Sequence, residues 1–226
     1  MKLQSWAAAA FCVAALSACS SGLNAVIDTA RSVFRGGDGP SVDSVPLNPN
    51  FRYLRVTLNG RVALLARGYR DQHPLGEVEV WYSAEKEVLR LQNGRLVGAT
   101  GVTTEWRAVT LPKLPSWSAV AVAKSPVQWV RTRDVMPGYR YGVRDAVRLY
   151  AIPPPAKTQL KELGPGALTW FEEQVESDSR EQLPARYGVE LRDGIETVIY
   201  GEQCLASELC FTWQRWPAPA NLPGRK

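Results

Sequence analysis

Two Asn-Gly dipeptides, each between runs of alternating apolar and polar residues, restrict the fold of this chain more than any other feature. Each dipeptide joins two candidate strands: residues 51–58 and 61–69 flank Asn59-Gly60, and residues 87–92 and 95–100 flank Asn93-Gly94. Asn-Gly favours the positive φ angles that a two-residue hairpin turn needs at both positions. The sequence therefore predicts antiparallel hairpins in a body that is rich in β-structure.

The two hairpins also resemble each other in sequence. Asn-Gly-Arg-Val follows the first strand and Asn-Gly-Arg-Leu follows the other, and a Leu-Arg pair precedes each turn. A duplicated β unit would explain the likeness. Independent selection of a favourable hairpin turn in each place would give the same residues, and we favour this second interpretation.

The rest of the chain carries further candidate strands, several of them bounded by proline or glycine. They are residues 78–82, 127–133, 144–152, 168–175, 186–191, 197–202 and 209–216. Prolines 153–155 end one of them because proline has no N–H group for a sheet ladder, and a short helix is expected over residues 156–163. We predict a mostly β fold, an antiparallel sandwich or an open barrel-like body, with one N-terminal helix and this short internal helix.

Residues 1–18 have the features of a bacterial signal peptide. Lys2 is followed by an apolar stretch at residues 6–16, which is too short to span a membrane because a spanning helix needs about 20 apolar residues. Leu16-Ser17-Ala18-Cys19 matches the lipobox, in which the cysteine thiol is lipidated and a peptidase cuts before it. An ordinary signal peptide with a chance cysteine is the alternative. The leucine, the small pair and the depth of the cysteine favour a lipoprotein that is tethered through Cys19.

We expect three parts: a signal peptide at residues 1–18, a lipid-anchored helix and flexible linker at 19–49, and a single β-rich periplasmic domain at 50–226. Apolar residues recur at helical spacing over residues 21–35, and this helix either lies on the membrane or packs on the domain. Ser20, where an aspartate would favour the inner membrane, favours transfer to the outer one. The expected location is the outer membrane, through the lipid anchor, with the body facing the periplasm.

Cys204 and Cys210 remain after the signal peptide is removed and Cys19 is lipidated. Such a pair persists as a disulfide in an oxidising compartment, so we favour a disulfide over two free thiols. The single histidine, His73, is far away in sequence, and a zinc site would therefore lack ligands. We expect no metal and no organic cofactor.

The charge pattern does not suggest a nucleic-acid partner. The chain has 27 basic and 22 acidic residues, for a formal net charge of +5, and its arginines are scattered instead of grouped in blocks. A mildly basic surface suits acidic polysaccharide or lipid headgroups. A solvated face is the more common explanation, and we favour it.

Tryptophans are the candidate residues for glycan contact, because aromatic faces stack on sugar rings. The chain has 8 of them, and we assign most to the core because indoles bury large areas. Trp117 and Trp216 lie near Pro115 and Pro217, in expected loops. They are therefore the two that we select as possible contacts with a glycan.

No residue pattern of the chain indicates catalysis. Glu172 and Glu173 are adjacent, but neighbours in a strand point to opposite faces, whereas glycoside hydrolysis needs two facing carboxyl groups about 5 to 9 Å apart. His73 lies beside Pro74 in an expected loop and is interpreted as solvated. The chain has no Gly-x-Ser-x-Gly motif, and no Gly-rich phosphate loop follows a strand and opens a helix. We expect no catalytic residue.

Residues 51–106 resemble the YjbF/GfcB lipoproteins, whose relatives take part in exopolysaccharide and group 4 capsule production. The matching segments, after the lipobox and linker, are Phe51-Arg52-Tyr53, Ala63-Leu64-Leu65-Ala66, Trp81-Tyr82-Ser83-Ala84, Leu91-Gln92-Asn93-Gly94-Arg95-Leu96-Val97 and Thr100-Gly101-Val102. The resemblance implies a mostly β body at the outer membrane, without a known cofactor or known catalytic residues.

Three functions compete on these grounds. The leading hypothesis is a lipid-anchored, non-catalytic accessory protein of exopolysaccharide or capsule production or export, whose partners are polysaccharide and export proteins. A glycan-binding module is the alternative and overlaps with the first. A cell-surface glycan hydrolase is the third, and it would need a concave pair of acidic residues.

Overall fold

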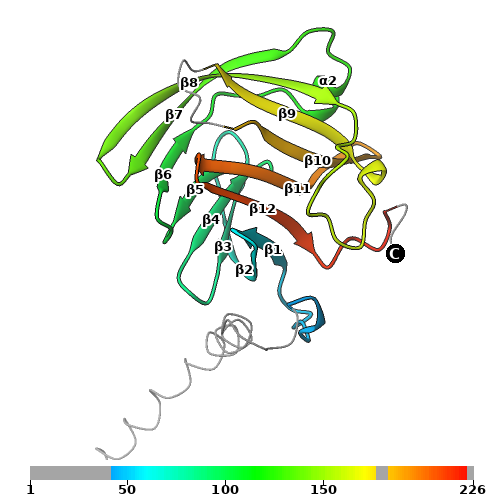
Figure 1. The fold of residues 1–226 in the computed structure, drawn as a ribbon. Coiled ribbons are helices and arrows are strands. Elements are labelled where there is room, and N and C mark those ends of the chain that lie inside the picture. Colours follow the sequence, from blue (N-terminus) through cyan, green and yellow to red (C-terminus); the bar gives the residue numbers. More distant parts are fainter. Residues whose placement is uncertain (1–41, 177–182, 223–226) are drawn as a thin grey trace, which may run out of the picture.

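The computed structural model describes residues 42–176 and 183–222, and in these residues twelve antiparallel strands form one closed sheet (Figure 1). In chain order the strands are β1 (Tyr53–Leu58), β2 (Arg61–Asp71), β3 (Val78–Tyr82), β4 (Val88–Gln92), β5 (Arg95–Thr100), β6 (Glu105–Thr110), β7 (Val127–Met136), β8 (Arg140–Ile152), β9 (Thr169–Glu176), β10 (Ala185–Arg192), β11 (Ile195–Ala206) and β12 (Leu209–Trp216). The prediction of a mostly β, antiparallel fold is confirmed.

The sheet closes because its first and last strands pair with each other. β1 and β12 are antiparallel partners from Tyr53 opposite Trp216 to Leu58 opposite Phe211. Every other pair joins strands that are consecutive in the chain. The expected sandwich or open body is therefore wrong: the sheet is a closed barrel, and closure pairs the edges that an open sheet would leave free.

Both predicted Asn-Gly turns are confirmed. Asn59 and Gly60 have φ angles of 49° and 79°, and Asn93 and Gly94 have φ angles of 49° and 77°. The β1–β2 and β4–β5 hairpins are consequently in register directly from the turn. The structure adds β6, which the sequence analysis did not include.

The helices differ from those expected. The predicted N-terminal helix over residues 21–35 lies outside the described residues. The predicted helix over residues 156–163 is wrong, because side chains of the barrel bind the backbone groups of this segment. The Gln214 amide accepts a hydrogen bond from Lys161 N and donates one to Lys161 O, both at 2.9 Å, and the Tyr200 hydroxyl accepts one from Gln159 N at 3.0 Å.

A short helix, α2 (Trp117–Ala121), forms where a loop was expected. The Ser116 hydroxyl accepts a hydrogen bond from Ala119 N at the N-cap, which satisfies one of the free amides of a helix N-terminus. The Glu196 carboxylate accepts two more, from Trp117 N at 2.7 Å and Ser118 N at 3.0 Å. Trp117 and Val120 belong to the interior core, so α2 packs into the barrel at one of its ends.

The two ends of the barrel differ. Since neighbouring strands are antiparallel, the connections alternate between the ends. One end, here named the α2 end, carries α2. The other, named the turn end, carries the β1–β2, β3–β4, β5–β6, β7–β8 and β11–β12 connections.

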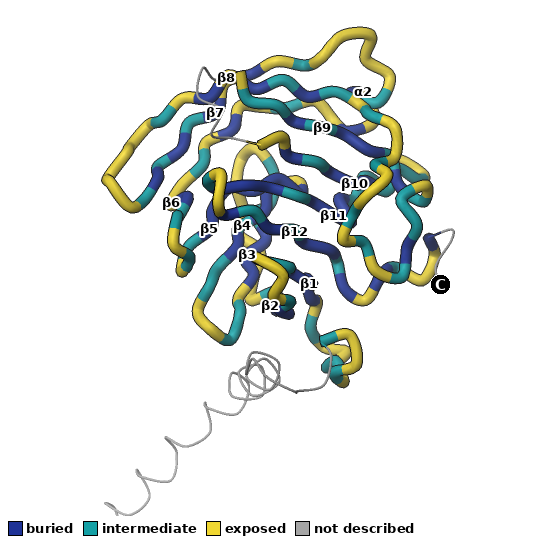
Figure 2. The backbone as a smooth tube through the Cα atoms, viewed as in Figure 1, coloured by how far each residue is buried: buried dark blue, intermediate teal, exposed yellow. Residues whose placement is uncertain are grey.

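Two outer segments cover part of the barrel wall. Residues 42–51, which include the short 3-10 helix η1 (Val42–Ser44), pack near Tyr53 and Trp216. Residues 153–168, with η2 (Pro165–Ala167), pack together with the C-terminal segment 217–222. Figure 2 shows the resulting burial as dark blue along β11 and β12. In the two described stretches, no helix has the length and apolar character needed to cross a membrane.

Candidate functional site at the turn end

The turn end holds two hollows that meet at Leu205. The first, here named the apolar cavity, has a volume of about 590 Å³. Aliphatic and aromatic side chains from strands on both sides form its wall: Val56, Leu65, Leu89, Ala99, Leu209 and Phe211. Its volume lies in the range of about 300 to 1,000 Å³ that is typical of small-molecule sites.

The second hollow, here named the polar hollow, has a volume of about 450 Å³. It is formed mainly by the β7–β8 hairpin, the end of β9 and the β11–β12 turn. The charged side chains that line it are three arginines and three carboxylates: Arg133, Arg140, Arg144, Asp145, Glu176 and Glu208. The two signs balance, so this hollow is not a simple anion site.

A buried network of ion pairs lies at the base of the polar hollow. Arg133 donates to Asp145 from Nε at 2.5 Å and from Nη2 at 2.8 Å. Arg131 donates to the same carboxylate from Nε and to Glu173 from Nη1, both at 2.6 Å. All four side chains are at most 8% exposed. Two guanidinium and two carboxylate groups thus neutralise each other inside the barrel.

The aromatic ring of Trp106 supports this network. The guanidinium carbons of Arg131 and Arg133 lie 4.9 and 4.6 Å from the ring centroid, which is the range of a cation–π contact. The indole Nε1 donates to the carbonyl of Leu205 at 3.2 Å. Trp106 therefore connects the buried charges to the β11–β12 hairpin.

The network favours the ionised forms of Asp145 and Arg131. Burial raises the pKa of Asp145, but the hydrogen bonds and charges of Arg133 and Arg131 outweigh it and hold that pKa below its ordinary value. Burial lowers the pKa of Arg131, and the charges of Glu173 and Asp145 reverse this and raise it. A general acid at neutral pH needs a raised carboxyl pKa. The pKa of Asp145 is lowered instead, so this carboxylate is suited to pairing with arginine and is not suited to donating a proton.

The β7–β8 hairpin presents exposed aromatic rings next to the polar hollow. Tyr139 and Tyr141 are 72% and 67% exposed. They flank Arg140, which lines the hollow. Tyrosine combines a large apolar face with a polar tip and suits contacts that are partly wet.

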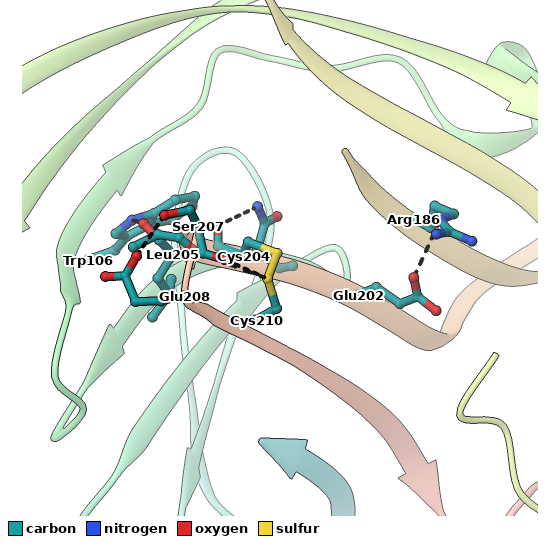
Figure 3. Close-up of a disulfide and its surroundings, with 10 residues drawn as sticks. Trp106, Arg186, Glu202, Cys204, Leu205, Ser207, Glu208 and Cys210 are labelled. Atoms are coloured by element: carbon teal, nitrogen blue, oxygen red, sulfur yellow. Dashed lines mark hydrogen bonds and ion pairs between the residues drawn. A yellow bond between two sulfur atoms is a disulfide. The ribbon is translucent and has the colours of Figure 1, made fainter. Parts of the chain in front are cut away.

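The predicted disulfide is confirmed. Cys204 and Cys210 are bonded and lie opposite each other in the β11–β12 ladder (Figure 3). In the same hairpin, Leu205 borders both hollows, and Leu209 lines the apolar cavity. The disulfide thus cross-links the two strands of the hairpin that separates the two hollows.

The structure does not place the two predicted glycan-contact tryptophans on the surface. Trp117 is 3% exposed, donates from Nε1 to the carbonyl of Asn93, and lies 3.7 Å below the guanidinium of Arg95. Trp216 is 7% exposed and packs under residues 42–51. The expectation of exposed rings in loops is wrong, because α2 turns one indole into the barrel and the N-terminal segment covers the other. Cys19, the predicted lipidation site, lies outside the described residues.

The remaining candidates behave as the sequence analysis expected. Glu173 points into the barrel to Arg131, whereas its neighbour Glu172 accepts a hydrogen bond from the Tyr150 hydroxyl at 2.7 Å. The two carboxylates therefore do not face each other. His73 is exposed and contacts the Gln92 amide at 2.9 Å through Nδ1.

Sequence reasoning missed the buried charges and the exposed tyrosines. The sequence of β7 did contain one sign of the buried arginines. Every second residue from Trp129 to Val135 is buried, and Arg131 and Arg133 occupy two of these positions. In a strand this spacing puts all four on one face. The carboxylates that neutralise the arginines come from other strands, and no local pattern identifies them.

Comparison with known proteins gives a family match, a similarity to solved structures and one negative result. The model of a family described as "Group 4 capsule polysaccharide lipoprotein gfcB, YjbF" matches residues 28–213. The crystal structure of the hypothetical lipoprotein YmcC from Escherichia coli (K12) is similar in fold, with a TM-score of 0.54 and 15% sequence identity. The match covers 75% of this chain and 88% of that one. No curated protein matches the sequence.

Proposed function

Because the chain belongs to the YjbF family of group 4 capsule polysaccharide lipoproteins, we propose that it is an accessory protein of capsule or exopolysaccharide production or export and that it catalyses no reaction. The observation that carries this proposal is the family match over residues 28–213, which is far longer than the resemblance over residues 51–106. The partners in this proposal are the polysaccharide and the proteins that export it.

The buried charges support a non-catalytic role. Asp145 and Glu173 are held by arginines, and Asp145 has a lowered pKa. A carboxylate with a lowered pKa, such as Asp145, acts as a structural counter-ion and does not act as a proton donor at neutral pH. By joining β7, β8 and β9, the network is suited to keeping the barrel wall beside the polar hollow rigid.

The lipobox supports the location in this proposal. Lipidation of Cys19 would tether the chain, and Ser20 favours the outer membrane, with the barrel in the periplasm. Secreted polysaccharide has to pass through this compartment. Residues 20–41 would form the connection between the lipid and the barrel.

A glycan-binding role is the second candidate, and the turn end favours it. Arginines and carboxylates in the polar hollow offer donors and acceptors to sugar hydroxyl groups. Tyr139 and Tyr141 add exposed aromatic faces on the adjoining hairpin. This role is compatible with the first, since contact with the glycan is one of two ways in which an accessory protein would assist export, the other being contact with the export proteins.

Deletion of the gene tests the proposal. The deletion strain should make less cell-attached polysaccharide, or polysaccharide of altered length, while growth and the synthesis of sugar precursors are unchanged. The wild-type gene should restore the polysaccharide, and a Cys19→Ala variant should not, because it lacks the tether.

Two outcomes would contradict the proposal. One is a normal amount of normally attached polysaccharide in the deletion strain under conditions that induce its synthesis. The other is catalytic depolymerisation of a polysaccharide by the purified protein, which would favour the hydrolase.

A further inference from the structure

The apolar cavity is a consequence of barrel size. A closed sheet of eight strands is just wide enough for side chains to fill, and the diameter grows with strand number. At the α2 end, aromatic rings fill the extra width: the Trp117 ring lies 4.9 Å from Phe171 and 5.2 Å from Tyr187, between centroids. At the turn end, smaller side chains such as Ala63 and Ala99 leave about 590 Å³ unfilled.

Such a space is far larger than the packing voids of an ordinary core, which seldom exceed a water molecule. Its wall is made largely of hydrocarbon, so water gains few hydrogen bonds inside it. Apolar walls of this kind hold water weakly and favour apolar ligands. The wall therefore selects a hydrocarbon group over a sugar or a peptide, whose polar groups would lose their hydrogen bonds.

The rim of the cavity carries charges of both signs. Arg61 is exposed and makes no ion pair within the described part of the chain. Glu85 and Glu87 lie on the neighbouring β3–β4 turn, and the Glu87 carboxylate accepts a hydrogen bond from the Ser83 hydroxyl. The complementary ligand has a hydrocarbon chain for the cavity and a head group with one negative and one positive charge for the rim.

We propose that the apolar cavity binds one acyl chain of a zwitterionic phospholipid, with the phosphate at Arg61 and the ammonium group at Glu85 and Glu87. This site is separate from the polar hollow and from the proposed covalent lipid on Cys19. It adds a lipid-binding activity to the proposed role in polysaccharide production, and it does not depend on that role.

Native mass spectrometry of the intact lipoprotein, purified in a mild detergent, tests the proposal. The wild-type protein should carry one non-covalent phospholipid. After its removal, lysophosphatidylethanolamine should rebind at least tenfold more tightly than lysophosphatidylglycerol, which has a net negative head group. Absence of a rebinding lipid, or equal affinity for the two head groups, would overturn the proposal.

Variants that fill the cavity provide the structural control. Ala63→Trp and Ala99→Trp each place an indole in the cavity from a different strand, and each should abolish rebinding. Ala146→Trp adds the same group at an exposed position of β8 and should bind like the wild type.

Thermal unfolding without lipid identifies any variant that is misfolded. The lipid should raise the Tm of the wild type and not of a folded cavity variant. Undiminished binding by folded Ala63→Trp and Ala99→Trp proteins would contradict the assignment to this cavity.

Discussion

Arg133 binds both oxygens of the Asp145 carboxylate, from Nε at 2.5 Å and from Nη2 at 2.8 Å, inside the barrel. Arg131 shares this carboxylate, so one aspartate neutralises parts of two guanidinium groups. Breaking a buried ion pair by removing one partner is strongly destabilising, because the other charge stays buried without compensation. The stability of the barrel should therefore depend on this aspartate.

Asp145→Asn should lower the free energy of unfolding by about 3 to 5 kcal/mol at neutral pH. Urea denaturation followed by tryptophan fluorescence measures this change. Asp71→Asn, at an exposed position of β2, is the control and should stay within about 0.5 kcal/mol of the wild type. A loss below 1 kcal/mol for Asp145→Asn would contradict the role given to the network.

The same residue predicts a pH dependence. The pKa of Asp145 in the folded protein lies below its ordinary value of 3.8, so near that pH the unfolded chain binds more protons than the folded one. The stability from Asp145 is therefore fully present above pH 3.8 and is lost as the pH falls through the folded pKa. The wild type and Asp145→Asn should differ most near neutral pH and less below about pH 4. A difference that stays constant from pH 7 to pH 3 would argue against this explanation.

The two Asn-Gly hairpins offer a matched comparison of glycine substitutions. Gly60 and Gly94 have nearly equal φ angles, 79° and 77°, but a Cβ atom at Gly94 would collide with Val198 whereas one at Gly60 meets open space. Gly60→Ala should cost about 1 kcal/mol, from the left-handed conformation alone. Gly94→Ala should cost about 3 kcal/mol because of the added overpacking. Equal Tm losses for the two variants would show that the Val198 contact is unimportant.

The Cys204–Cys210 disulfide closes a short loop, with a sequence separation of 6. In the chain-entropy account this contributes about 2 kcal/mol to stability. The double variant Cys204→Ala/Cys210→Ala should thus still fold but with a Tm lower by several degrees, measured by circular dichroism. Reduction with dithiothreitol should lower the Tm of the wild type similarly and leave that of the variant unchanged. A shift of equal size in both proteins would mean that the reductant acts elsewhere.

The sequence predicted the parts of the fold that are encoded locally. Asn93-Gly94 specifies a hairpin because turn geometry depends on adjacent residues, and β3, β5 and β12 have the bounds that alternation predicted. The pairing of β1 with β12 joins distant parts of the chain, and no local signal distinguishes a closed sheet from an open one.

The candidate site was less predictable for the same reason. The Cys204–Cys210 pair was found because its two members are close in sequence. Trp117 was assigned to a loop because Pro115 precedes it, but the cap at Ser116 and the carboxylate of Glu196, which comes from β11, fold the segment into a helix. The polar hollow and the apolar cavity both arise from barrel closure, so neither was visible in the sequence.

The most direct test of the account is the amount of cell-attached polysaccharide in a deletion strain that carries variants of this gene. A Tyr139→Ala/Arg144→Ala protein removes one exposed ring and one cation at the turn end. Val122→Ala/Lys124→Ala removes one exposed apolar side chain and one cation beside α2, and is the matched control. With equal protein levels confirmed by immunoblot, the control should restore wild-type polysaccharide and the turn-end variant should restore less than half. Full restoration by the turn-end variant would contradict the claim that this end of the barrel serves polysaccharide production.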